Sequence, residues 1–147
     1  MPRTDPLRNF RFRVEIDNFA RAGFAEVSLG AIETQAVDYR EGTDPTHLRK
    51  LSGLTKYGNV MLKSGLTTGS DALELFHWQR DVASGLLAQS RRRVVIVLQD
   101  EAGQDQARFV VSNAWPVKYE ASPLSARSNE VVIETLELAN EGIERVQ

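Results

Sequence analysis

The side chains best suited to acid–base catalysis or metal binding near neutral pH are the two histidines, His47 and His77. Neither lies in a GxSxG or HExxH motif, so acyl-transfer chemistry has no support. Glu74, His77 and Asp81 share one face of an expected helix, and Glu-x-x-His is half of a di-iron ligand pattern, but the second half and the two partner glutamates are missing. A lone imidazole on a helix is normally a partly buried polar residue. We therefore predict no catalytic and no metal-binding residues.

Two further patterns could hold a phosphate group. Gly53 and Gly58 have the spacing of a phosphate-binding loop, but Asn59 and Val60 follow where Lys and Ser or Thr are needed. Residues 91–93 are Arg-Arg-Arg, yet three basic residues that open a buried strand are more often a solvated strand end or a guard of a sheet edge. We predict no bound cofactor.

Composition excludes other classes of protein. The chain has 147 residues, a formal net charge of -2 and no cysteine. This charge offers no basic field for nucleic acid, and the lack of cysteine excludes disulfides, thiolate catalysis and cysteine-ligated metals. No apolar stretch approaches the roughly 20 residues of a membrane span, and the N-terminal segment lacks the apolar core of a signal peptide. We expect a single domain over residues 1–147, made and folded in the cytoplasm without membrane insertion.

Strand patterns dominate the chain. Apolar and charged residues alternate along 9–19, a period of two that predicts a half-buried strand. Further strands are expected at 25–29, 32–39, 59–66, 94–98, 107–114 and 129–139, with a hairpin turn at 100–103 and a bulge from Ile133 to Thr135. A helix from about Asp71 to Ser84 has apolar positions at helical spacing, between a cap at Ser70 and a cap at Gly85. These elements predict a mainly β domain, a β-sandwich or split barrel, with one packed helix.

The segment from Tyr39 to Asn59 is expected to be a long loop between two strands. Most connections in compact domains have about 4 to 6 residues, so a loop of roughly 20 is usually functional or disordered. Apolar residues recur in it at three-residue spacing among charges, which suits a segment that orders against a partner. The candidate assembly residues are Tyr39, Arg40, Glu41, Asp44, His47, Leu48, Arg49, Lys50, Leu51, Leu54, Lys56 and Tyr57.

The first strand offers a second candidate surface. Exposed sheet edges must be guarded, covered or paired with another subunit, and head-to-tail pairing can close a ring that stacks into a tube. A charged strand face would tolerate an aqueous channel, and the residues expected on this exposed or lumen-facing side are Arg11, Arg13, Glu15 and Asp17. The alternative is a monomer with an ordinary wet sheet face and a flexible loop.

Five segments carry a resemblance to a known family. They read DPLRNFRFRVEIDNF at 5–19, AGFAEVSL at 22–29, VDYREGTDPTHLRKLSGLTKYGNVMLK at 37–63, NAWPVKY at 113–119 and NEVVIETLELANEGIERV at 129–146. Together they resemble the tail tube proteins of contractile phage tails and of extracellular contractile injection systems. The YREG and RKLxGLTKYGN blocks are specific in combination. The chain departs from the usual pattern at 28–30, which read SLG in place of SGL, and at 63–65, which read KSG in place of KRG or KWG.

The resemblance implies a structural subunit without enzymatic activity. Such subunits form hexameric rings whose strands join into one continuous barrel, and the rings stack into a rigid inner tube around a lumen for effector cargo or DNA. The implied partners are the sheath, the baseplate or spike, and the terminator of the particle, with assembly in the cytoplasm before the tube becomes part of a phage tail or a released tail-like particle. Two alternatives stay open: a tube-initiator or baseplate-adaptor layer of the same machine, and a small ligand-binding β-barrel protein.

Overall fold

The computed structural model describes residues 11–17, 24–40, 42, 49–65, 73–124, 126 and 132–147. Nine strands and two helices lie in these ranges: β1 (Phe12–Ile16), β2 (Glu26–Ser28), β3 (Ile32–Tyr39), β4 (Arg49–Tyr57), β5 (Val60–Gly65), α1 (Glu74–Ala83), α2 (Leu87–Ser90), β6 (Arg92–Gln99), β7 (Asp105–Ala121), β8 (Ile133–Ala139) and β9 (Gly142–Arg145). The predicted mainly β fold with a packed helix is confirmed. Neither helix in these ranges is long and apolar enough to cross a membrane.

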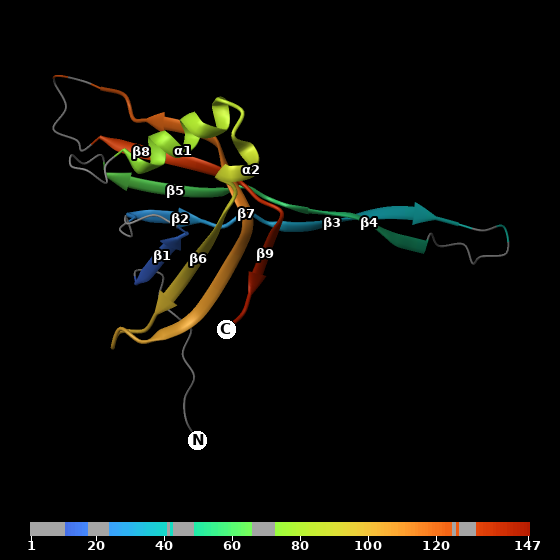
Figure 1. Ribbon diagram of the computed structural model, residues 1–147. Helices are drawn as coiled ribbons and strands as arrows, with labels where there is room; N and C mark the ends of the chain where they lie inside the picture. The colour runs from blue at the N-terminus through green and yellow to red at the C-terminus, as the bar shows by residue number, and fades with distance from the viewer. Residues whose placement is uncertain are drawn as a thin grey trace.

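Seven strands form the body of the subunit, and two form an arm that projects from it (Figure 1). The body sheet has the order β1-β6-β7-β8-β5-β2, with β9 also paired to β7, and its ladders are antiparallel. We call β3 and β4 the arm, because they pair with each other in a separate two-stranded sheet. The body buries the core, and the arm extends away from it.

β7 joins the two halves of the body. It is a 17-residue strand whose first part pairs with β6 and β9 and whose last part pairs with β8. Its register shifts by one residue near Asn113, which has a positive φ of 51°, and again between Pro116 and Lys118. Bulges bend a strand, and a proline is tolerated there because it needs no ladder hydrogen bond. The expected end of this strand at Ala114 is therefore wrong, since β7 turns from one half of the sheet into the other.

The core forms where the inward faces of these strands meet. In β1, Val14 and Ile16 are buried while Glu15 is exposed, which confirms the predicted alternation. They pack with Val94 and Ile96 of β6 and with apolar residues of β5, β7, β8 and α1. Burial of such side chains supplies most of the free energy that holds the sheet and helix together.

Helix α1 lies within the expected helical range. The N–H of Gly85 donates to the carbonyl of Val82 at 3.0 Å, and the φ of Gly85 is +89°, so the predicted C-terminal cap is confirmed. The predicted cap at Ser70 and the helix start at Asp71 lie outside the described residues. The following short helix α2 was not expected, and the indole N–H of the buried Trp78 donates to the carbonyl of Ser90 in it.

The expected bulge from Ile133 to Thr135 is wrong. β8 pairs with β5 in one continuous register, and the register shift lies in the opposing strand β7. The alternation of β8 is regular, but Glu134 occupies an inward-facing, buried position. A carboxyl group on the core face makes the pattern of apolar residues look disturbed in the sequence.

The expected loop from Tyr39 to Asn59 is also wrong over residues 49–57. Residues 49–57 form β4, which pairs with β3 from Ile32 opposite Tyr57 to Tyr39 opposite Arg49. Every residue of β3, and every residue of β4 except Tyr57, is exposed. Because this ribbon has no buried face, the alternation of apolar and polar residues that reveals most strands is missing. Residues 41 and 43–48 lie outside the described residues.

Candidate assembly surfaces

The arm presents two chemically different faces. Cross-strand pairs lie on the same face of a ribbon, so Val37 with Leu51 and Tyr39 with Arg49 occupy one face. The opposite face carries Asp38 with Lys50 and Ala36 with Ser52. The ladder is interrupted between Thr34 and Ala36, where Gly53 and Leu54 of β4 lie opposite Gln35. One arm face is therefore largely apolar and the other polar.

Apolar side chains of the arm are exposed to a degree unusual for a folded strand. Leu54 is 81% exposed and Leu51 is 51% exposed, and Val37 and Tyr39 are also exposed. An isolated two-stranded hairpin is at best marginally stable in water. A side-chain hydrogen bond of 3.0 Å between Thr34 and Thr55 supports the ladder, but exposed contacts of this kind contribute little. The arm is thus suited to gain its stability against another protein surface.

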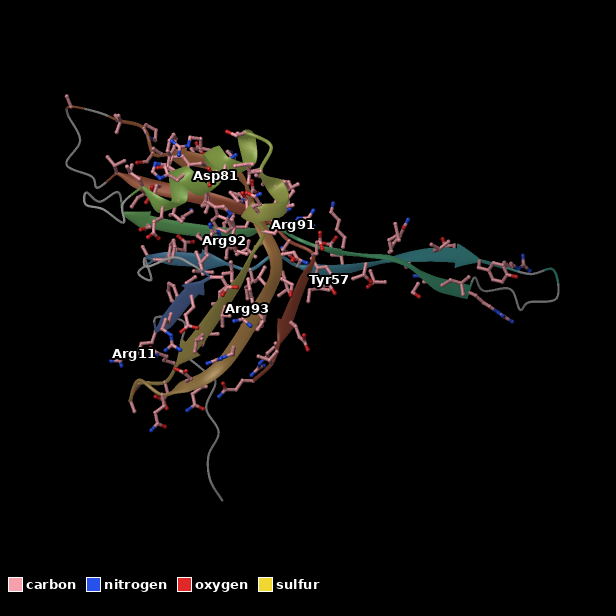
Figure 2. The ribbon with its side chains drawn as sticks, viewed as in Figure 1. Arg11, Tyr57, Asp81, Arg91, Arg92 and Arg93 are labelled. Atoms are coloured by element: carbon pink, nitrogen blue, oxygen red, sulfur yellow. The ribbon has the colours of Figure 1, made fainter. Side chains whose placement is uncertain are left out.

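A groove lies where the arm meets the body. It has a volume of about 850 Å³ and is lined by Glu33, Thr34, Gln35, Leu54, Thr55, Lys56, Tyr57, Asn140 and Glu141. Tyr57 is the partly buried residue at the root of the arm (Figure 2), and it packs against the core. Most of the lining residues are of polar types and the groove is open, which suits a protein contact better than a small apolar ligand.

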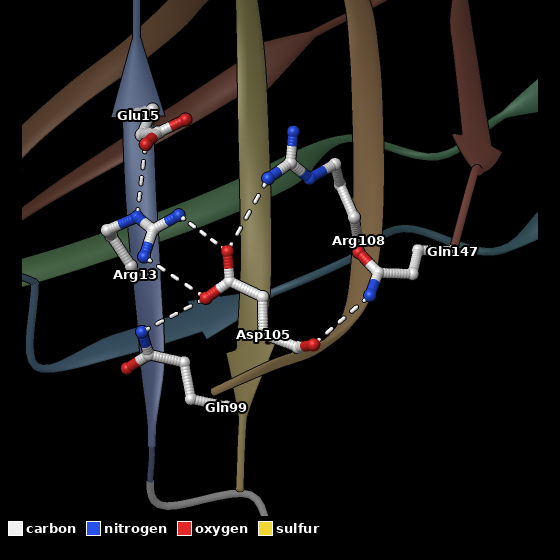
Figure 3. A network of polar contacts seen from close by, with 6 residues as sticks. All are labelled: Arg13, Glu15, Gln99, Asp105, Arg108 and Gln147. Atoms are coloured by element: carbon white, nitrogen blue, oxygen red, sulfur yellow. Dashed lines mark hydrogen bonds and ion pairs between the residues drawn. The ribbon is translucent and has the colours of Figure 1, made fainter. Parts of the chain in front are cut away.

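The outward face of β1 belongs to a charged network that spans three strands (Figure 3). Two guanidinium nitrogens of Arg13 donate to the carboxylate of Asp105 at 3.3 and 3.1 Å, and Arg108 lies 3.5 Å from the same carboxylate. Glu15 pairs with Arg13 at 3.0 Å, and Gln99 donates to Asp105 at 3.2 Å. The guanidinium of Arg13, followed by the amide of Gln99, holds the pKa of Asp105 below its usual range.

This network covers an apolar layer. Val97 is paired with both Arg13 and Arg108, and it is fully buried although it lies on the outward side of the sheet. Long arginine side chains can cover apolar surface with their stems while their charged ends stay near water. The result is a sheet face whose opposite charges are paired with each other over a buried valine.

The three consecutive arginines make contacts within the subunit. Arg91 pairs with Glu141 at 3.1 Å, and Arg93 lies 3.8 Å from the carboxylate of Asp17. Arg92 donates to the carbonyl of Asp17 at 2.8 Å and its guanidinium lies 5.6 Å from the ring centroid of Trp78. Figure 2 shows the three side chains where β6 begins. They connect the start of β6 with the end of β1, with the turn between β8 and β9 and with α1.

The described part of the chain contains no cluster of acidic residues and histidines that could hold a metal ion. His77 is partly buried, and its ring lies 6.3 Å from the ring of Phe76. His47 lies outside the described residues.

The sequence-predicted surface residues separate into two places. The arm holds Tyr39, Arg49, Lys50, Leu51, Leu54, Lys56 and Tyr57, with Arg40 directly after β3, and the outward side of β1 holds Arg11, Arg13, Glu15 and Asp17. Glu41, Asp44, His47 and Leu48 lie outside the described residues. Sequence reasoning missed Val37 on the arm, Asp105 and Arg108 in the charged network, and Asn140 at the root of the arm. Only Val37 had a local signal, because it alternates with Tyr39.

Solved structures of contractile machines have the same fold. A chain in the sheath–tube complex of the PVC extracellular contractile injection system in its extended state matches with a TM-score of 0.79 at 26% identity, covering 96% of this chain and 91% of that chain. A chain of the anti-feeding prophage tube-terminating cap matches with a TM-score of 0.80 at 21% identity, covering 100% and 95%. A chain of the anti-feeding prophage baseplate matches with a TM-score of 0.78 at 24% identity, covering 98% and 97%.

Sequence comparison gives a family. No curated protein matches the chain significantly. The model of the family described as T4-like virus tail tube protein gp19 matches residues 8–144. This match takes in the core strands, the arm and the charged strand face together, and the chain therefore belongs to the T4-like virus tail tube protein family.

Proposed function

We propose that this tail tube protein forms hexameric rings that stack into the rigid inner tube of a contractile tail or injection system. In this proposal residues 1–147 act as one structural domain without catalytic activity. The observation that carries the proposal is the arm, an exposed β-ribbon that projects from a well-packed body. A ribbon of this kind suits a subunit whose folding is completed by its neighbours.

The apolar face of the arm is the surface that we assign to contacts with another copy. Val37, Leu51 and Leu54 are exposed in the single subunit, and covering them would remove apolar area from water. The charged pair of Asp38 and Lys50 on the opposite face would stay near solvent and help to set register. In this proposal the described residues of the arm divide into a side that is buried on assembly and a side that stays in solvent.

Ring closure is assigned to the edges of the body sheet. Among the described residues β1 pairs only with β6, and β2 pairs only with β5, so each has one open edge. Open edges present unpaired N–H and C=O groups that can pair with another chain. Two different edges on one subunit allow the head-to-tail pairing that closes a ring.

The paired charges around Arg13 and Asp105 form a polar surface that is suited to an aqueous lumen for effector cargo or DNA. The partners of the tube in this proposal are the sheath, the baseplate or spike and the terminator. The similarity to a chain of the PVC sheath–tube complex supports this assignment. Assembly would take place in the cytoplasm, before the tube joins a phage tail or a released tail-like particle.

Light scattering and negative-stain microscopy of the purified chain test the proposal. We expect a ring with six copies, or tubes of stacked rings, at micromolar concentration. An interface of roughly 2,000 Å² or more, typical of obligate assemblies, would make such rings stable on dilution. A particle that remains monomeric at high micromolar concentration would contradict the proposal.

A further inference from the structure

We propose that Asn140 is a positioning residue that fixes the direction in which the arm leaves the body. This inference rests on the proposed function of the arm in assembly. It concerns the root of the arm, where the chain passes from β2 of the body into β3 of the arm and returns from β4 of the arm into β5 of the body (Figure 1).

The arm continues a ladder of the body in the same register. Ser28 lies opposite Met61 in the body, and Ile32 lies opposite Tyr57 in the arm. Each strand has three residues between these two pairs, so neither side gains or loses a residue at the junction. The arm is therefore an extension of the β2–β5 edge and not an independent insertion.

Two glycines bring the strands unusually close at this junction. A Cβ atom on Gly30 would lie 2.2 Å from the carbonyl carbon of Gly58, and a Cβ on Gly58 would lie 2.9 Å from the nitrogen of Ala31. One hydrogen bond crosses the gap, from the N–H of Gly58 to the carbonyl of Ala31 at 2.8 Å. Glycine leaves the backbone more conformational freedom than any other residue. At this junction one backbone hydrogen bond joins the two strands beside the two glycines. A further contact is therefore needed to fix the angle between the arm and the body.

The side chain of Asn140 makes that connection. Its Nδ2 donates to the carbonyl of Gly58 at 2.9 Å, and its Oδ1 accepts from the N–H of Gly142 at 3.2 Å. One amide group therefore joins the root of the arm to the turn between β8 and β9. This bond lies beside the groove that separates the arm from the body, which Asn140 also lines.

The turn is a firm anchor. The N–H of Glu141 donates to the carbonyl of Ser112 at 3.0 Å, and the Glu141 carboxylate contacts Arg91 at 3.1 Å and the Asn113 amide at 3.0 Å. The turn is thus held to β7 and to the residue before β6. A hydrogen bond from this turn fixes Gly58 relative to the body and not only relative to its neighbours in the chain.

The geometry of the arm makes its angle matter. The eight residues of β3 span about 26 Å at a rise of about 3.3 Å per residue. A change of about 10° at the root would move the far end by about 4.5 Å, close to the spacing of about 4.8 Å between neighbouring strands. An arm that must reach one surface on another copy would then miss it by about one strand.

The variant Asn140→Asp separates the two hydrogen bonds of this side chain. It keeps an oxygen acceptor for the N–H of Gly142, but it removes the donor to the carbonyl of Gly58 and places a carboxylate oxygen there. Asn140→Ala removes both bonds and adds no charge, so it gives a second measurement if the aspartate variant does not fold. The control is Arg91→Ala, which removes the ion pair to Glu141 but leaves both Asn140 bonds in place, and the turn stays held to β7 by the bonds of Glu141 with Ser112 and Asn113.

Electron–electron distance measurements between two spin labels give the readout. The chain has no cysteine, so Lys50→Cys on the arm and Lys118→Cys on the body provide unique labelling sites. Labelled protein is diluted into unlabelled parent, so that distances within one subunit dominate. We expect Asn140→Asp and Asn140→Ala to shift or broaden the distance distribution while the circular dichroism spectrum and melting temperature stay near those of the parent, and Arg91→Ala to leave the distribution unchanged.

A distance distribution that both Asn140 variants leave unchanged would overturn the inference, and so would an equal change in Arg91→Ala. Negative-stain microscopy of the same samples tests the proposed function separately. If the parent forms no tubes, the assembly proposal fails, whatever the distances show. If the parent forms tubes and the Asn140 variants change the distances and shorten the tubes, both are supported.

Discussion

The hydroxyl of Tyr119 donates a 2.7 Å hydrogen bond to a carboxylate oxygen of Glu134, and Glu134 is only 2% exposed. The two residues lie on paired strands, with β7 carrying the tyrosine and β8 the glutamate. Buried polar groups are costly unless they are hydrogen-bonded, so this pair lets a carboxyl group occupy the core face of β8.

Tyr119→Phe should destabilise the subunit by about 1–3 kcal/mol, because it leaves a buried acceptor without this donor. The aromatic ring and its edge contact with Phe76, 5.6 Å between centroids, are kept, so the loss reports on the hydroxyl. Urea denaturation measures the change. Tyr39→Phe removes a hydroxyl from the exposed arm and serves as the control, for which a similar loss would argue against a special role of the buried pair.

Val14→Asp should prevent folding, because Val14 is fully buried and the new carboxylate would lie in the apolar core cluster without a charge partner. Arg13→Gln, one residue away on the opposite face, should leave the protein folded and change the unfolding free energy by about 1 kcal/mol, since ion pairs at the surface of a sheet contribute little. Circular dichroism with urea denaturation measures both. A folded Val14→Asp protein would contradict the assignment of the two faces of β1.

Excision of the arm should separate folding from assembly. We would replace residues 33–56 with Asn-Gly, which favours a tight hairpin turn between the paired residues Ile32 and Tyr57. The body should melt near the temperature of the parent, because the strand residues removed, 33–39 and 49–56, are exposed. Microscopy should show no stacked tubes. Tubes of normal length would mean that the arm is dispensable for stacking.

Leu51→Asp and Ser52→Asp test which face of the arm is covered. The two variants introduce the same charge at adjacent positions of β4 that point to opposite faces. Leu51→Asp should block tube formation, because it would bury a carboxylate in an apolar contact, whereas Ser52→Asp should assemble. Sedimentation of assembled protein measures this difference. Equal assembly by both variants would show that the face carrying Leu51 and Val37 stays in solvent.

Acid should weaken the charged face of the sheet. The pKa of Asp105 is lowered in the folded state by the hydrogen bonds from Arg13, so this carboxylate stabilises the fold above its ordinary pKa of 3.8. That stability is lost as the pH falls below this value and through the lowered pKa. Asp105→Asn should therefore show a smaller drop in stability between pH 5 and the acid range than the parent, measured by urea denaturation at each pH. An identical pH dependence in both proteins would exclude Asp105 as a source.

The body of the subunit could be predicted where one strand face is buried and the other is wet. Val14 and Ile16 alternate with Arg13 and Glu15, and this local pattern is sufficient to place β1 and its two faces. The same reasoning failed for β4, because a ribbon that is exposed on both faces leaves no such pattern. Gly53 and Gly58 were considered only for their phosphate-loop spacing, although Gly58, directly after β4, allows a close approach of two strands.

Contacts between distant segments could not be predicted from one sequence. Arg13 and Asp105 are separated by 92 positions, and Asn140 and Gly58 by 82. Only the topology brings them together, since β6 and β7 carry Asp105 beside β1 and the β8–β9 turn reaches the root of the arm. The exposed apolar residues of the arm, which are candidates for assembly, were easier to single out, because apolar side chains among charges are conspicuous without any tertiary information.

The order of the strands also determines how the subunit bears load. A pull between β1 and β2 runs across the sheet, along the hydrogen bonds of antiparallel ladders, and each ladder on the way carries the same force in series. β6 has eight residues and β5 has six, but β2 has only three. The β2–β5 ladder, with three residue pairs, is therefore the weakest connection in this series. Under excessive tension the sheet would part there first, at the strand from which the arm begins.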